Sequence, residues 1–221
     1  MSFPPSLDDV QSLIAETAGA DTSATGPVLQ ALGQFLQIAR SPDAAALQPG
    51  EVTELGDYAL QLLQSLALQA RDTPRSWGPA AVAVADWVMQ RGGRVQTLEP
   101  VVDALAELAN RTREPDRLAE ITDFMERLTG ACAQSVRADL ELSNPGRPWR
   151  ILHLNRAITA TRSLDPERMV RAFDALTHAL PHDAPEFFHQ GMGEMERLGY
   201  PEPVRRVMAD YHRRWTRPKT N

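Results

Sequence analysis

The stretch EPDRLAEITDFMERL, residues 114–128, decides the fold class because it contains both the start and the apolar face of a helix. Pro115 stands in a first helical turn, where its missing N–H would have no partner within the helix. The acidic residues Glu114 and Asp116 complement the positive end of the helix dipole. Apolar residues then recur at three- and four-residue spacing, which predicts a helix with one buried face.

Similar helix starts recur through the chain, and no convincing run of alternating β-branched residues is present. These patterns predict an all-α protein in which the seventeen prolines mark helix starts and breaks rather than disorder. The break at Gly199-Tyr200-Pro201 divides the last of nine predicted segments in two. The segments lie near residues 7–18, 27–40, 50–71, 77–91, 98–111, 115–142, 148–162, 166–180 and 185–215.

Weak self-similarity between helix starts favours a repeated helical hairpin. EPDRL at 114–118 resembles DPERM at 165–169, and Asp123 and Asp174 follow the two stretches at equal spacing. Stacked hairpins would form a short α-solenoid of tetratricopeptide or HEAT type. The hairpins resemble tetratricopeptide repeats in length only, because the W-x-x-L-G-x-x-Y signature is not filled at any tryptophan. Chance similarity is the alternative, since capping chemistry itself selects proline and acids.

We expect about nine to ten helices, packed as consecutive antiparallel hairpins in a single all-helical domain of residues 1–221. A subdivision into acidic helices at 1–72 and a hairpin array with a basic C-terminal end at 73–221 is the alternative. Residues 1–136 contain 9 arginines and 18 acidic residues, a formal charge of −9, whereas residues 137–221 contain 14 basic and 11 acidic residues, a charge of +3. The N-terminal and C-terminal parts of the chain therefore have net charges of opposite sign.

Composition excludes several classes of protein. Cys132 is the only cysteine, so the chain cannot form an internal disulfide, a four-cysteine zinc site or an iron–sulfur cluster, and a reducing compartment is expected. The N-terminal MSFPPSLDD has no basic residue before its apolar positions, which predicts no secretory signal. The longest apolar stretch, Trp77–Met89, contains Asp86 and is shorter than the ~20 residues that span a bilayer. We expect a soluble, cytoplasmic protein without a membrane partner.

Histidines in the last third of the chain are the candidates for a metal site. Imidazoles beside carboxylates suit transition metals, and a carboxylate three residues before a histidine is half of a di-metal site in helical bundles. However, no second Glu-x-x-His exists, and Glu186 and His189 lie off the apolar stripe of their segment. We expect a polar helix start and no cofactor, and keep a metal protein or enzyme as the alternative. Its ligands would be His178, His182, Glu186 and His189.

Catalytic motifs are missing from the sequence. Neither a Gly-x-Ser-x-Gly, a Walker-type nor a Gly-x-Gly-x-x-Gly stretch is present. Cys132 follows Thr129-Gly130-Ala131 among small apolar residues, which predicts a buried structural thiol on a helix rather than a nucleophile. The sequence therefore gives no positive support for catalysis.

Arginines beside aromatic residues form two candidate binding groups. Such groups can contact phosphates and stack on bases, but the pI of about 5.4 argues against nucleic acid, which is kept only as an alternative. An acidic protein segment fits better, or self-association, because residues 1–60 contain eight acidic residues and one arginine. A solvated helix face without a partner is the other interpretation. The first group is Arg147, Trp149 and Arg150, and the second is Arg205, Arg206, Arg213, Arg214 and Trp215.

These observations favour a non-catalytic protein-binding or scaffolding module. The last helix is expected to dock through an apolar stripe that includes Val204, Met208 and Tyr211, with its arginines left available to an acidic partner.

Overall fold

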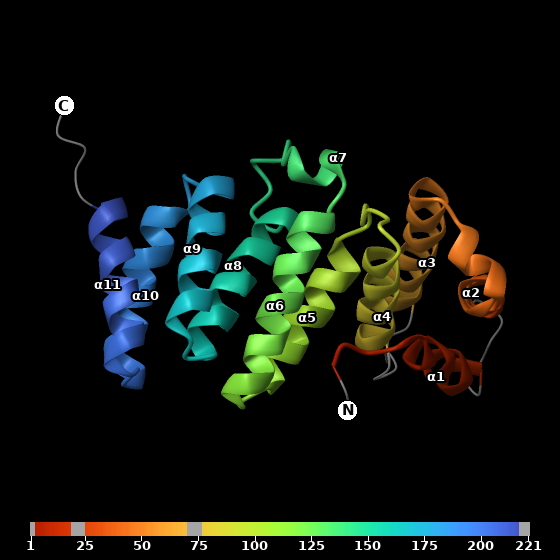
Figure 1. Cartoon of the computed structure of the whole chain (residues 1–221), viewed down its shortest axis with the longest axis horizontal. Helices are drawn as coiled ribbons and strands as arrows, with labels where there is room; N and C mark the ends of the chain where they lie inside the picture. Colours follow the sequence, from red (N-terminus) through yellow and green to blue (C-terminus); the bar gives the residue numbers. More distant parts are fainter. Residues whose placement is uncertain (1–2, 19–24, 70–76, 217–221) are drawn as a thin grey trace. The chain divides into compact units, whose positions relative to one another are not determined.

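The computed structural model describes residues 3–18, 25–69 and 77–216, and within these ranges the protein is all-α (Figure 1). The predicted fold class is therefore confirmed. Eleven α-helices are present in these ranges, one of them only four residues long. They are α1 (Leu7–Ala18), α2 (Gly26–Arg40), α3 (Pro49–Gln69), α4 (Trp77–Gln90), α5 (Glu99–Arg111), α6 (Pro115–Ala131), α7 (Gln134–Arg137), α8 (Pro148–Arg162), α9 (Pro166–Ala179), α10 (Ala184–Leu198) and α11 (Glu202–Thr216), with a 3-10 helix, η1 (Pro42–Ala46), between α2 and α3.

α6 is shorter than the sequence predicted. The spacing of apolar residues predicted one helix over 115–142, but α6 ends at Ala131. Here the backbone N–H of Val95 donates to the carbonyl of Ala131 at 3.0 Å, and the N–H of Ala133 donates to the carbonyl of Val95 at 2.9 Å. These two hydrogen bonds to the loop after α4 replace the next helical ones, so α7 is a separate turn.

The chain divides into two compact units. The first comprises Met1–Leu108 and Arg127–Leu142, and the second comprises Ala109–Glu126 and Ser143–Asn221. α6 contributes residues to both. The alternative boundary between residues 72 and 73 lies outside the described residues.

The first unit packs α1 against α2 and α4, and α3 against α2 and α4. α4 is its central helix, because nearly every side chain from Ala80 to Val88 is buried. The indole of Trp87 meets the ring of Phe35 edge-on, with centroids 5.4 Å apart. Many of the buried residues of α4 are alanine or valine, which allows neighbouring helices to approach closely.

Gly56 marks a close approach of α3 to α4. A Cβ at this position would lie 2.1 Å from Cγ2 of Val88, and both residues are buried. We expect Gly56→Ala to lower the free energy of unfolding of the first unit by about 2 kcal/mol, because overpacking outweighs the gain in helix propensity. Val88 is β-branched and stiff, so it has little freedom to move aside. Urea unfolding measures the loss.

Gly33 on α2 provides the matched control, since nothing lies within 4 Å of a Cβ built there. Gly33→Ala should be neutral or stabilising by up to about 1 kcal/mol. Combining Gly56→Ala with Val88→Ala should cost less than the sum of the two single changes. Equal effects of the alanines at Gly56 and Gly33 would contradict the close approach.

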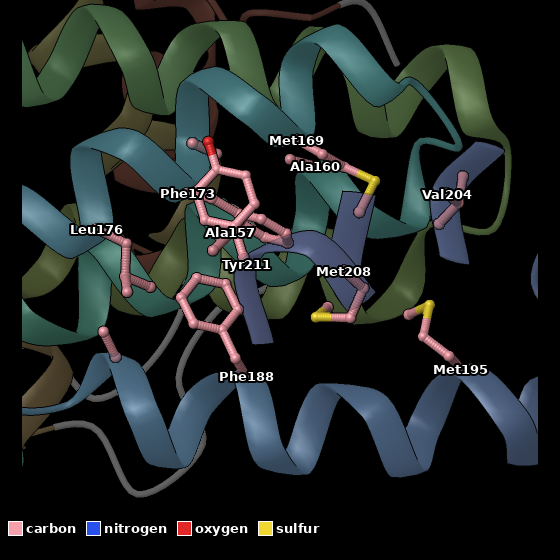
Figure 2. Close-up of a cluster of buried hydrophobic side chains, with 12 residues drawn as sticks. Ala157, Ala160, Met169, Phe173, Leu176, Phe188, Met195, Val204, Met208 and Tyr211 are labelled. Carbon is pink, nitrogen blue, oxygen red and sulfur yellow. The ribbon is translucent and has the colours of Figure 1, made fainter. Parts of the chain in front are cut away.

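The second unit packs α8 against α9, α10 against α11, and α9 against α11. Its core is a cluster of buried apolar side chains from these four helices (Figure 2). The ring of Phe173 meets those of Phe188 and Tyr211 edge-on, with centroids 5.1 Å away in each case. The predicted helix start at Asp165 is confirmed, because its side chain accepts hydrogen bonds from the N–H groups of Glu167 and Arg168.

The two aspartates aligned by the self-similarity both accept hydrogen bonds from later helices, one from an arginine and the other from a tyrosine. Asp123 on α6 accepts hydrogen bonds from Nε and Nη2 of Arg168 on α9, at 2.9 and 2.8 Å. Asp174 on α9 accepts one from the hydroxyl of Tyr211 on α11, at 2.5 Å. In both cases the carboxylate ties its helix to a later helix of the second unit.

Candidate protein-binding surfaces

α11 presents its arginines to solvent, as the sequence predicted. Val204, Met208 and Tyr211 are buried and dock the helix against its neighbours (Figure 2). Trp215 is partly buried against the same cluster. We call the four exposed arginines the α11 arginine surface: Arg205, Arg206, Arg213 and Arg214.

The four arginines differ in how far their charge is already compensated. Arg205 makes no side-chain hydrogen bond or ion pair with any residue in the described part of the chain. Its guanidinium is therefore the most available of the four. The other three are engaged within α11, Arg206 with Glu202, Arg213 with Asp210, and Arg214 over the ring of Tyr211.

A groove of about 260 Å³ lies beside Met208, between α8, α10 and α11. Ile158 and Leu198 line it and are 47% and 53% exposed. The thioether of Met208 lies against Gly191, and such flexible side chains let a groove adapt its shape. We call this site the α8–α10 groove; its apolar lining is Ile158, Phe187, Met195, Leu198, Tyr200 and Met208.

Sequence reasoning missed this groove because its lining comes from three separate helices, of which α8 is separated from α10 and α11 by α9. Ile158 and Leu198 read as ordinary apolar positions of amphipathic helices, and nothing in their spacing shows that they stay half exposed. The nearest signal was Met208, which lies in the apolar stripe expected to dock the last helix.

The rim of the groove contains one arginine that no carboxylate neutralises within the described residues. Arg162 donates hydrogen bonds to two backbone carbonyls at the C-terminal end of α5. The carbonyl of Ala109, in the last turn, is 2.8 Å away, and that of Thr112, the residue after the helix, is 2.6 Å away. Glu194, also on the rim, pairs with Arg197 at 2.6 Å. The groove therefore combines an apolar floor with two charged lining residues, Arg162 and the ion-paired Glu194.

The first unit contains an open hollow of about 410 Å³ between α2, η1 and α3. Ile38 and Tyr58 line it and are 44% and 50% exposed. The carboxylate of Glu51 accepts a hydrogen bond from the N–H of Gln48, whereas that of Glu54 has no bonded partner among the described residues. We call this site the α2–α3 hollow; its lining is Ile38, Leu47, Glu51, Glu54, Leu55 and Tyr58.

The first predicted arginine group is part of the fold of the second unit. Arg147 and Trp149 are buried, at 7% and 9% exposure. Arg150 is half-buried, and its Nε donates to Oδ1 of Asp183 at 2.7 Å, while its Nη1 donates to the carbonyl of Pro145 at 2.9 Å. Of the two groups, the α11 arginine surface is the exposed one.

α8 also buries two ionisable side chains, those of His153 and Arg156. Arg156 Nη2 lies 3.1 Å from Oε1 of Glu126. His153 meets the ring of Trp149 edge-on, and neither of its ring nitrogens has a hydrogen-bond partner in the described structure. Burial, and then the charges of Arg156 and His178, lower the pKa of His153 to about 4. The imidazole is therefore neutral at physiological pH.

The four histidine-region residues lie on α9, on α10 and in the turn between them. Glu186 accepts a hydrogen bond from Nε2 of Gln190 at 2.6 Å, and His189 stacks on His212 with centroids 6.1 Å apart. Within residues 3–18, 25–69 and 77–216, no group of three or more His, Cys, Asp or Glu is arranged to hold a metal ion. The predicted surface position of Glu186 and His189 is confirmed, since all four residues are exposed: His178, His182, Glu186 and His189.

Cys132 is buried, as predicted, but it lies just beyond α6 in the bridge with Val95 rather than on a helix. Burial raises the pKa of its thiol to about 12. The thiol is therefore protonated at neutral pH, so it cannot act as a thiolate nucleophile.

Among the described helices, none has both the length and the apolar character needed to cross a membrane. The groove, the hollow and the α11 arginine surface are the candidate binding features of the described residues. Comparison with known protein families, curated proteins and solved structures found no match to the chain.

Proposed function

We propose that this protein is a non-catalytic binding or scaffolding module that holds an acidic protein segment. The α8–α10 groove receives an apolar side chain of that segment, and the α11 arginine surface meets its carboxylates. The observation that carries the proposal is the half-exposed apolar lining of the groove, with Arg162 at its edge.

The apolar lining supports a macromolecular partner. Exposed apolar side chains that gather in a concave site commonly mark an interaction surface, whereas single exposed ones need no explanation. Ile158 and Leu198 lie on different helices and border one groove, so they form such a gathering. A partner side chain that enters the groove would remove both from water, in the manner of a buried anchor at a protein interface.

The size of the groove favours a side chain over a cofactor. Its volume of about 260 Å³ falls below the range of about 300–1,000 Å³ that is usual for small-molecule sites. It exceeds the roughly 150 Å³ of an apolar cavity that accepts benzene. A leucine or an aromatic side chain of a partner therefore fits.

The charges beside the groove favour an acidic partner. Arg205 precedes Met208 by three residues, so it lies exposed about one helical turn from the part of α11 that lines the groove. Arg162 borders the groove from α8. Neither arginine forms an ion pair with a carboxylate of the described residues. Complementary charge would speed association with an acidic segment and disfavour basic ones.

We further propose that the helix pairs of the second unit form a short α-solenoid. Support comes from the hydrogen bonds of Asp123 and Asp174, each of which connects its helix to a later one. Stacked helical pairs commonly present an extended binding surface, and a groove between α8 and α10 suits that use.

A synthetic peptide tests the proposed function directly. The probe is a fluorescein-labelled peptide with one tryptophan between runs of glutamate, and its binding is followed by fluorescence anisotropy. We expect the wild-type protein to bind it, with affinity that falls as salt rises. Replacing Arg205, Arg206, Arg213 and Arg214 together by glutamine should preserve the fold, because exposed charges contribute little to stability, and should weaken binding about tenfold or more.

Single substitutions provide a matched control. Arg205→Gln should weaken binding measurably, whereas Arg137→Gln removes the same charge from an exposed site in the first unit and should not. Equal binding of a lysine-flanked peptide, or an unchanged affinity in the quadruple variant, would contradict the role of the arginines. Unfolding of the quadruple variant would show that they are structural.

A further inference from the structure

We infer that the acidic segment held by the α8–α10 groove belongs to a second copy of this chain. Tyr58, in the α2–α3 hollow of one copy, enters the groove of the next copy, and Glu54 meets Arg205. This inference rests on the proposed function of the groove and adds the identity of its occupant.

Both surfaces leave apolar side chains in water on the same chain. The α2–α3 hollow exposes Ile38 and Tyr58, and the groove exposes Ile158 and Leu198. Pairing the two surfaces between copies would bury all four residues. An aromatic ring such as that of Tyr58 is among the side chains most often found as interface anchors.

The charges of the two surfaces are opposite. α3 contains no lysine or arginine, and Glu51 and Glu54 line the hollow. α11 contains four exposed arginines against Glu202 and Asp210. Glu54 and Arg205 are the members of each surface without a side-chain partner in the described structure, so they are free to pair with each other.

The spacing of charge and anchor also matches. Glu54 and Tyr58 are four residues apart on α3, so they lie on one side of that helix. Arg205 is exposed three residues before Met208 on α11, about one helical turn away from it. Each surface thus places its charge about one helical turn from its apolar contact, and a phenol ring fits a groove of about 260 Å³.

The proposed contact joins two different surfaces, the hollow of one copy and the groove of the next. A head-to-tail contact leaves one surface free at each end, so further copies can add until a ring closes or a filament grows. The expected product therefore exceeds a dimer at high concentration.

Sedimentation velocity on the full chain tests this inference. Across a roughly hundredfold range of protein concentration at low salt, the weight-average sedimentation coefficient of the wild type should rise, and added salt should reduce the rise. Two variants should each stay monomeric: a hollow variant, Glu54→Ala with Tyr58→Ala, and a groove variant, Ile158→Asp. Circular dichroism checks that both retain the helical fold.

Mixing the two variants gives the sharpest result. The hollow variant keeps an intact groove and the groove variant keeps an intact hollow, so the mixture should form one-to-one dimers and nothing larger. Leu140→Ala and Val170→Asp change exposed apolar residues outside both surfaces and should assemble as the wild type does.

Three results would overturn the inference: a wild type that is monomeric throughout the range, assembly that persists in either variant, or a mixture that fails to form dimers. The glutamate-flanked peptide separates this outcome from failure of the proposed function. If the wild type is monomeric but binds the peptide, and Ile158→Asp abolishes that binding, the groove holds an acidic segment of another protein. If the wild type neither self-associates nor binds the peptide, both proposals are wrong.

Discussion

Replacing Phe173 by alanine is expected to lower the free energy of unfolding of the second unit by about 4 kcal/mol. The ring is fully buried and contacts three other aromatic rings at centroid distances of 5.1 to 5.8 Å. Truncation removes apolar surface from the core and leaves a cavity that its rigid neighbours fill only in part. Urea unfolding, combined with hydrogen exchange of peptides from each unit, measures the loss and locates it.

Two further variants serve as controls for Phe173→Ala. Phe173→Leu keeps most of the side-chain volume, so its cost should be clearly smaller. Phe35→Ala removes a buried ring from the first unit and should instead accelerate hydrogen exchange there. A loss below about 1 kcal/mol for Phe173→Ala would show that the aromatic cluster is not the main core of the second unit.

Acidification from pH 6.5 towards pH 4 is expected to destabilise the second unit by about 3 kcal/mol through His153 alone. The pKa of this histidine is about 4 in the folded protein, against an ordinary value of 6.5. Between these values the unfolded chain binds a proton that the folded chain does not bind. Stability is therefore fully present above pH 6.5 and is lost as the pH falls through this window.

Comparison with His153→Leu isolates this effect from the titration of carboxylates. Leucine binds no proton, so the stability of the variant relative to wild type should increase by about 1.4 kcal/mol per pH unit below pH 6.5. Thermal or urea unfolding across the window measures it. His189→Leu, which removes an exposed imidazole from α10, should not produce this difference. Parallel pH profiles for wild type and His153→Leu would contradict the burial of a neutral imidazole.

Helix starts were predictable because their chemistry is local. Proline and acidic residues in a first turn satisfy geometric and electrostatic needs of the backbone within a few residues, whatever packs nearby. The start of α9 at Asp165 and the break after α10 at Gly199 are both where the sequence placed them. The end of α6 was not predictable, because it depends on hydrogen bonds to Val95, more than thirty residues away in sequence.

Exposure of charged residues was predictable for one arginine group and not for the other. On α11 the apolar stripe is regular, so the arginines fall on the solvent side as the spacing requires. On α8, Trp149, His153 and Arg156 follow the same helical spacing as solvent-facing residues would. Arg156 can be buried because the carboxylate of Glu126 on α6 compensates its charge, whereas His153 is buried as a neutral imidazole. The spacing of residues within α8 does not show that a carboxylate from another helix lies nearby.

The sequence by itself determined the all-helical fold class, most helix starts, the buried Cys132 and the exposed arginines of α11. Each of these follows from interactions between residues a few positions apart or from helical periodicity. Tertiary structure alone decided the α8–α10 groove, the α2–α3 hollow and the burial of His153. Concave sites and buried charges arise where separate helices meet, and the distance between those helices is set by packing, which local spacing does not encode.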